Sequence, residues 1–121
     1  MAQSVLAIAE QMDGAFRKVA FEAVSEGKRI AQSMGTQLTA LVIGSEIEGI
    51  AGELGKYGAD KIVTADDPKL KEFLVDRYTD VATGVVESEK ASVVVAGASS
   101  IGKYLMVRLA ARLAAPLAMD C

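Results

Sequence analysis

The segment spanning residues 92–115 constrains the fold of this chain more than any other stretch. It opens with a compact apolar run, residues 93–96, which is rich in β-branched side chains and too short to form a helix. A turn bracketed by Gly97 and Gly102 follows. Beyond it, apolar residues recur at helical spacing until Pro116, which ends the helix because proline has no N–H to donate. A strand, a tight turn and a helix in this order predict half of a β-α-β unit.

The same alternation continues through the rest of the chain and predicts its fold class. Further apolar runs that predict strands cover residues 4–9, 38–43, 61–64 and 117–119. The first run is apolar on both faces, as expected for a buried parallel strand. We therefore expect residues 1–121 to form a single α/β domain, a three-layer, doubly wound parallel sheet with strand order 3-2-1-4-5. Its crevice would lie between the first and fourth strands, beside Glu10 and Gly97.

Between these strands, apolar side chains recur every three or four residues and predict helices. The first predicted helix covers residues 15–34. The second covers residues 45–57 and begins at a Ser-x-x-Glu capping box whose N-cap is Ser45. The third covers residues 70–89, either as one continuous helix or with a second start at which Asp76 is the N-cap.

Composition excludes several classes of function. The net charge of −3, from 13 basic and 16 acidic residues, argues against a nucleic-acid partner. No apolar run approaches the length of a membrane-spanning helix. The sequence has no histidine, which removes the usual general base, and its one cysteine, Cys121, favours a reducing, cytoplasmic setting without disulfides or metal. We expect no enzymatic activity from this chain on its own.

The turn after the fourth strand is the candidate binding site. It matches the pattern G-x-x-x-x-G-K, but Tyr104 follows where a nucleotide-hydrolysing P-loop needs Ser or Thr for magnesium. The helix N-terminus could still hold an anion. The residues that would bind it are Gly97, Ser99, Ser100 and Gly102.

Acidic residues argue against an anion at this turn. Glu10 and Asp13 follow the first strand and point toward the same crevice, where negative charge disfavours a phosphate. The interpretation we favour is structural: the glycines permit a tight strand-to-helix turn and the serines cap the helix. A second acidic pair, Asp66 and Asp67, is interpreted as a solvated turn.

Six segments of the chain together form a recognisable pattern: VLAIAE at 5–10, YGADKI at 57–62, ADD at 65–67, AGAS at 96–99, VRLAARL at 107–113 and MDC at 119–121. In this combination they resemble the alpha subunits of electron transfer flavoproteins. The chain departs from that pattern at Tyr104, where Asp or Asn is usual, and at Val107, where proline is usual. The resemblance covers nearly the whole chain.

This resemblance implies an adenine-nucleotide-hydrolase-like fold and a role in electron transfer. Such proteins are alpha–beta heterodimers that carry electrons from dehydrogenases through FAD. The N-terminal alpha domain packs with the beta subunit beneath a C-terminal alpha domain that holds most of the flavin, and the structural AMP belongs to beta. This chain would then be a fragment, an assembly domain with no cofactor of its own. The alternative is a stand-alone adenine-nucleotide-binding module that uses the turn at Gly97.

Overall fold

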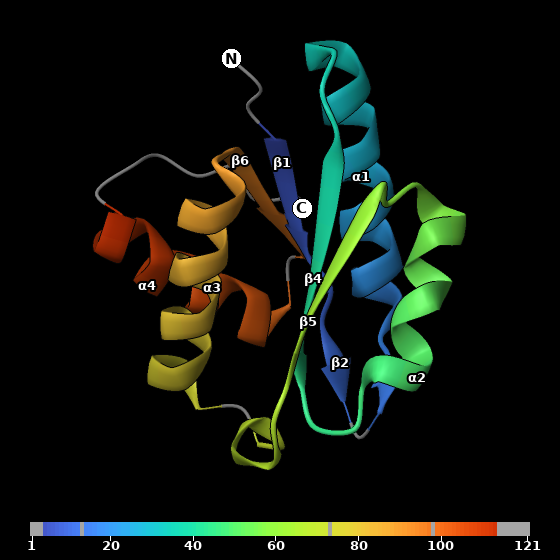
Figure 1. Cartoon of the computed structure of the whole chain (residues 1–121). Helices are drawn as coiled ribbons and strands as arrows, with labels where there is room; N and C mark the ends of the chain where they lie inside the picture. The colour runs from blue at the N-terminus through green and yellow to red at the C-terminus, as the bar shows by residue number, and fades with distance from the viewer. Residues whose placement is uncertain (1–3, 13, 73, 98, 114–121) are drawn as a thin grey trace.

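The computed structural model describes residues 4–12, 14–72, 74–97 and 99–113, with the backbone alone at positions 100 and 113. Its centre is a four-stranded parallel sheet in the order β5-β4-β1-β6 (Figure 1). The strands are β1 (Ser4–Ile8), β4 (Leu38–Gly44), β5 (Lys61–Asp66) and β6 (Ala91–Ala96). The predicted order 3-2-1-4 is confirmed, while the predicted fifth strand at 117–119 and the helix end at Pro116 lie outside the described residues.

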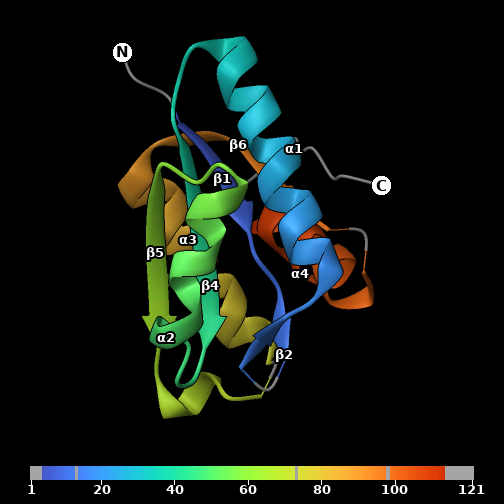
Figure 2. The same ribbon diagram turned by 90° about the vertical axis from the view of Figure 1, so that its right-hand side faces the viewer.

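Helices cover both faces of this sheet, so the predicted three-layer architecture is confirmed (Figures 1 and 2). One face carries α1 (Lys18–Met34), α2 (Glu48–Ala51) and the 3-10 helix η1 (Gly52–Tyr57). The other face carries α3 (Val75–Glu89) and α4 (Ser100–Leu113), which pack side by side. A short 3-10 helix, η2 (Pro68–Leu70), joins β5 to α3.

The two central strands supply a core on each side of the sheet. Successive side chains of a strand point to opposite faces. Val5 and Ala7 accordingly pack in the core that includes the buried residues of α1, whereas Leu6 and Ile8 pack in the core that includes those of α3 and α4. All seven residues of β4 are buried. This burial on both faces explains why β1 and β4 read as continuous apolar runs.

The first helix begins three residues later than the sequence predicts. Residues 15–16 belong instead to a small antiparallel hairpin of β2 (Gln11–Met12) and β3 (Ala15–Phe16). Gly14, with φ of +81°, supplies the left-handed conformation that the connection needs. The Gln11 side chain accepts from the Gly14 N–H at 3.0 Å and donates to the Ile43 carbonyl at 3.1 Å. The hairpin is therefore tied to the carboxyl end of β4.

The capping box predicted at Ser45 is wrong. Helix α2 has only four residues, its N-cap position is Ile47, and no side chain of its own caps it. The Asp66 carboxylate at the end of β5 does so instead: it accepts from the N–H groups of residues 46, 47 and 48 at 2.7, 3.0 and 3.3 Å. Asp66 is therefore solvent-exposed, as expected, but it is the last residue of β5 and caps α2 rather than forming a turn.

The second start of the third helix is confirmed, but not its cap. Helix α3 begins directly after Leu74, whose side chain makes no capping bond, and Asp76 lies in the first turn, where its charge favours the helix dipole. The acidic residue that does cap is Asp67. It accepts from the Lys69 N–H at 2.8 Å and is the N-cap of η2, which ends at Leu70, so the helix predicted to be continuous over residues 70–89 starts only at Val75.

Asp66→Asn is expected to lower the stability of the domain at neutral pH and to leave it nearly unchanged in acid. Hydrogen bonds from the Glu46, Ile47 and Glu48 N–H groups hold the pKa of Asp66 below its ordinary value. A carboxyl whose pKa falls on folding stabilises the fold above its unfolded pKa of about 4 and loses that contribution as the pH drops through the folded pKa. Urea unfolding at several pH values measures the difference.

The matched control is Glu22→Gln, because Glu22 is an exposed residue in the middle of α1, away from the helix ends and from the cap at Asp66. Its stability should follow that of the wild-type chain at each pH. A difference between wild type and the Asp66 variant that stays constant from neutral pH to acid would contradict the assignment of Asp66 as a charged cap.

Candidate functional site

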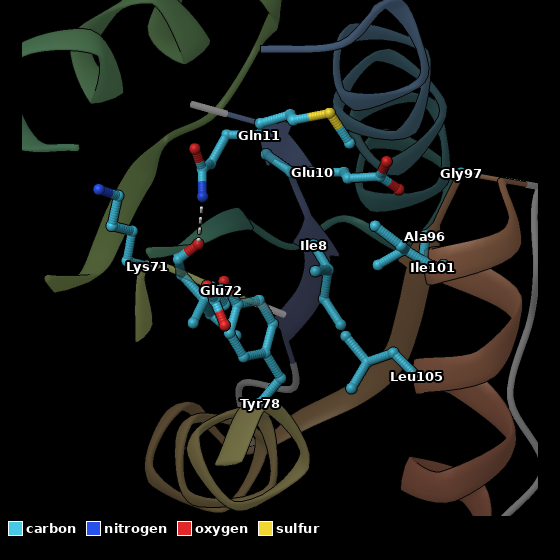
Figure 3. A pocket seen from close by; sticks show the side chains of 14 residues that line it. Ile8, Glu10, Gln11, Lys71, Glu72, Tyr78, Ala96, Gly97, Ile101 and Leu105 are labelled. Atoms are coloured by element: carbon cyan, nitrogen blue, oxygen red, sulfur yellow. Dashed lines mark hydrogen bonds between the residues drawn. The ribbon is translucent and has the colours of Figure 1, made fainter. Parts of the chain in front are cut away.

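A cavity of about 260 Å³ opens at the carboxyl edge of the sheet (Figure 3). It lies where the strand order predicts the crevice, and both Glu10 and Gly97 line it. Much of the lining is apolar and comes from β1, β2, β4, β6, α3 and α4. The apolar lining residues are Ile8, Ala9, Met12, Ile43, Tyr78, Ala96, Ile101 and Leu105.

Polar groups also line the cavity. The Tyr78 hydroxyl donates to the Leu70 carbonyl at 2.7 Å, and burial raises the pKa of the Tyr78 phenol, so it remains a protonated donor at neutral pH. Lys71 and Glu72 also line the cavity and are exposed. A second, more polar hollow of about 680 Å³ adjoins it at Gln11 and Lys71.

The size of the cavity limits what it can enclose. Pockets that bury ordinary small ligands occupy about 300–1,000 Å³. At about 260 Å³, this cavity lies just below that range, and the more polar hollow of about 680 Å³ opens beside it.

The turn after β6 brings three of the four predicted site residues together. The Ser99 hydroxyl accepts from the Gly102 N–H at 3.0 Å, and the Lys103 N–H donates to the Ser99 carbonyl at 2.9 Å. Ser100 begins α4, and its side chain is outside the described part of the chain. Ser99 therefore caps α4, as the structural interpretation expects, while binding of an external anion here stays a prediction.

The two glycines of this turn stand where no side chain fits. A Cβ atom at Gly97 would lie 2.6 Å from the Cβ of Val19 on α1. A Cβ atom at Gly102 would overlap the carbonyl oxygen of Gly97. The turn is consequently folded tightly on itself and against α1.

Glu10 lies against this turn and forms an ion pair that could not be predicted from the sequence. Its carboxylate accepts from the Ser99 hydroxyl and pairs with Arg17 Nη1 at 2.7 Å. The Glu10 side chain is only 10% exposed. Arg17 reaches it because the hairpin returns the chain, as the bond from the Arg17 N–H to the Glu10 carbonyl at 3.3 Å shows.

Sequence reasoning found Glu10 but missed Arg17, Lys71, Glu72 and Tyr78. None belongs to a local motif: Arg17 reaches the site through the hairpin, Lys71 and Glu72 through the segment between η2 and α3, and Tyr78 from α3 itself. Within the ranges that the structure describes, no three acidic or cysteine side chains are grouped to hold a metal ion. Nor does any helix there combine the length and apolar character needed to cross a membrane.

The architecture has a counterpart among solved structures. A universal stress protein in complex with cAMP superposes with a TM-score of 0.65, over 99% of this chain and 98% of that one, at 16% identity. At that identity the likeness concerns the fold alone. It confirms the expected adenine-nucleotide-hydrolase-like arrangement.

Comparison of the sequence with those of known proteins identifies the family more specifically than the likeness of fold does. The alpha subunit of the electron transfer flavoprotein of Bacillus subtilis is 42% identical over 99% of this chain. The beta subunit of the electron transfer component of acryloyl-CoA reductase from Anaerotignum propionicum is 44% identical over 93%. The chain spans only 36% and 30% of these two proteins.

The sequence model of a protein family, the electron transfer flavoprotein domain, matches residues 5–121 of this chain. With this match over almost its whole length, the chain belongs to the electron transfer flavoprotein family.

Proposed function

We propose that this chain is the N-terminal assembly domain of an electron transfer flavoprotein alpha subunit. Together with a beta subunit, that protein carries electrons from dehydrogenases through FAD. The observation that carries the proposal is the alignment of 99% of this chain with 36% of the Bacillus subtilis alpha subunit. The single cysteine of the sequence fits a reducing, cytoplasmic setting.

The domain acts as a platform rather than as the redox centre. A flavin needs a pocket that encloses its ring system and tunes the ring nitrogens. The sequence contains no histidine or tryptophan, and the cavity of about 260 Å³ lies below the usual range for small-ligand pockets. FAD would therefore be held by the C-terminal part of an alpha subunit, and this domain would be a component of the electron carrier, without catalytic activity of its own.

The stand-alone nucleotide-binding module is the weaker alternative. It requires an anionic phosphate at the turn formed by Gly97, Ser99, Ser100 and Gly102, where the partly buried Glu10 carboxylate already lies. A negative charge at that place disfavours a second one.

A chimera tests the proposed function. The segment of the Bacillus subtilis alpha subunit that aligns with this chain is replaced by residues 1–121, and the product is co-expressed with the matching beta subunit. We expect a heterodimer that retains FAD, seen in its visible absorption, because the replaced part contributes packing surface rather than flavin contacts. The isolated chain is expected to be colourless.

An alpha subunit from which the segment is deleted serves as the control and should fail to assemble. A chimera that folds, as judged by circular dichroism, yet elutes as a monomer without beta would contradict the assembly role. Stoichiometric FAD on the isolated chain would contradict the assignment of the flavin to another domain.

A further inference from the structure

Helix α4 exposes apolar side chains on its outer face, and we propose that the domain binds the beta subunit through this face. Tyr104 is 59% exposed and Val107 is 66% exposed, the two highest values among the large apolar side chains of the described residues. The partner presents apolar side chains bordered by carboxylates. The inference rests on the proposed assembly role and adds the surface of this domain that makes the contact and the chemistry of the surface that it meets.

The exposed apolar residues of α4 lie along one line. Tyr104, Val107 and Ala111 follow one another at the spacing i, i+3 and i+7, and all three are exposed. The opposite face of α4 is buried, and its core residues are Leu105, Met106 and Leu109. An amphipathic helix ordinarily carries polar side chains on the face turned away from the core. In α4 the centre of that face is apolar.

No element among the described residues covers this line of side chains. Helix α4 packs beside α3, on the side of the molecule away from the edge strand β5 (Figures 1 and 2). Single apolar side chains are common on protein surfaces, whereas contiguous apolar patches mark sites of interaction. Tyr104 and Val107 are neighbours on the helix surface, about one turn apart. The outer face of α4 is therefore a contact surface without a partner in the described part of the chain.

The charges of α4 indicate that the partner is acidic. The helix carries three basic residues, Lys103, Arg108 and Arg112, and no acidic one, in a chain whose net charge is −3. Arg108 pairs with Asp76 of α3 at 3.5 Å. Arg112 pairs with Asp80 of α3 at 2.8 Å. All four side chains are at least 45% exposed, and ion pairs this exposed are weak, so the carboxylates of a partner can compete for the two arginines.

These features disfavour other occupants of the surface. Two copies of α4 placed face to face would bring basic side chains against each other, which costs free energy. Helices that bind membrane surfaces bury a broad apolar face, and here only Tyr104 and Val107 are large. The covalently attached remainder of an alpha subunit is held at high effective concentration without further attraction. A separate subunit has to meet the domain by diffusion, and complementary charge around an apolar centre speeds that encounter.

The experiment measures binding of this chain to the immobilised beta subunit of its own organism by surface plasmon resonance. We expect the combined variant Tyr104→Ser and Val107→Ser to raise Kd about 30-fold, because a few apolar side chains at the centre of an interface carry most of its affinity. Lys103 has no ion-pair partner among the described residues. Lys103→Glu should therefore lower the association rate about tenfold at low salt and reduce its dependence on salt.

The controls place similar substitutions on the other face of the sheet. Met34→Ser removes an apolar side chain of α1 that is 44% exposed, and Lys56→Glu reverses an exposed charge of η1. Both should bind the beta subunit as the unaltered chain does. Circular dichroism verifies that each variant is folded, and Lys103→Glu tests the surface even if the combined serine variant is not.

The outcomes separate this proposal from the assembly role on which it rests. If the unaltered chain binds and the folded α4 variants bind equally well, the surface is wrong and the assembly role stands. If the unaltered chain does not bind the beta subunit, both are wrong. Losses of the same size in the Met34 and Lys56 variants would overturn the surface. It would also be overturned if the α4 variants kept their affinity for beta and instead lost a homodimer, seen by sedimentation equilibrium, or binding to phosphatidylglycerol vesicles.

Discussion

Gly102→Ala is expected to lower the free energy of unfolding by about 2–3 kcal/mol, the range of an overpacked core substitution. Ordinarily the same exchange inside a helix is favourable by about 1 kcal/mol, because alanine has the higher helix propensity. The sign reverses here because the new Cβ atom would overlap the Gly97 carbonyl oxygen, which is backbone and cannot rotate away. Urea unfolding monitored by circular dichroism measures the change.

Gly84→Ala is the matched control. Gly84 lies in α3, is exposed, and has no neighbouring atom within 4 Å of an added Cβ. It should raise the free energy of unfolding by about 0.5–1 kcal/mol. If both variants were stabilised, the tight contact between Gly97 and Gly102 would not exist in solution.

Leu6→Ala is expected to have the largest effect, a loss of about 3–4 kcal/mol in the free energy of unfolding. Leu6 lies on the central strand β1, is 0% exposed and packs in the core that includes the buried residues of α3 and α4. Neighbours on the paired strands β4 and β6 are fixed by the sheet hydrogen bonds, so the cavity left by alanine cannot collapse fully. The midpoint and slope of urea unfolding give the change.

Val107→Ala provides the comparison for this second prediction. Val107 is on α4, the helix that helps to cover the core around Leu6, but its side chain is 66% exposed. Its replacement should change the free energy of unfolding by no more than about 0.5 kcal/mol. A loss as large as that of Leu6→Ala would mean that the exposed face of α4 is covered in solution.

The sheet and its layers could be predicted from the sequence because their signals are local. A run such as residues 4–9 that is apolar on both faces has to be buried on both faces, which only a central strand allows. Helical periodicity then supplies the covering layers, and right-handed crossovers leave few strand orders. Glu10 and Gly97 follow the first and fourth strands, so this order also placed them at one crevice.

Capping, by contrast, was decided by the tertiary structure. The Ser45 pattern satisfies the local rule for a cap, yet the N–H groups of residues 46–48 bond to Asp66, which is 18–20 positions away. An N–H group bonds to whichever acceptor the fold brings nearest, and the pairing of β4 with β5 places Asp66 at that helix. No sequence pattern within a few residues of Ser45 indicates that Asp66 is the cap.

The arrangement of side chains at the candidate site was likewise decided by the tertiary structure. The sequence by itself determined the strands, the turn at Gly97 and a carboxylate at its edge. That the carboxylate is bonded to Ser99 and paired with Arg17 depends on the hairpin of β2 and β3 and on the pairing of β1 with β6. Periodicity describes which face of an element is apolar, whereas hydrogen bonds between elements depend on distances that exist only once the sheet has formed.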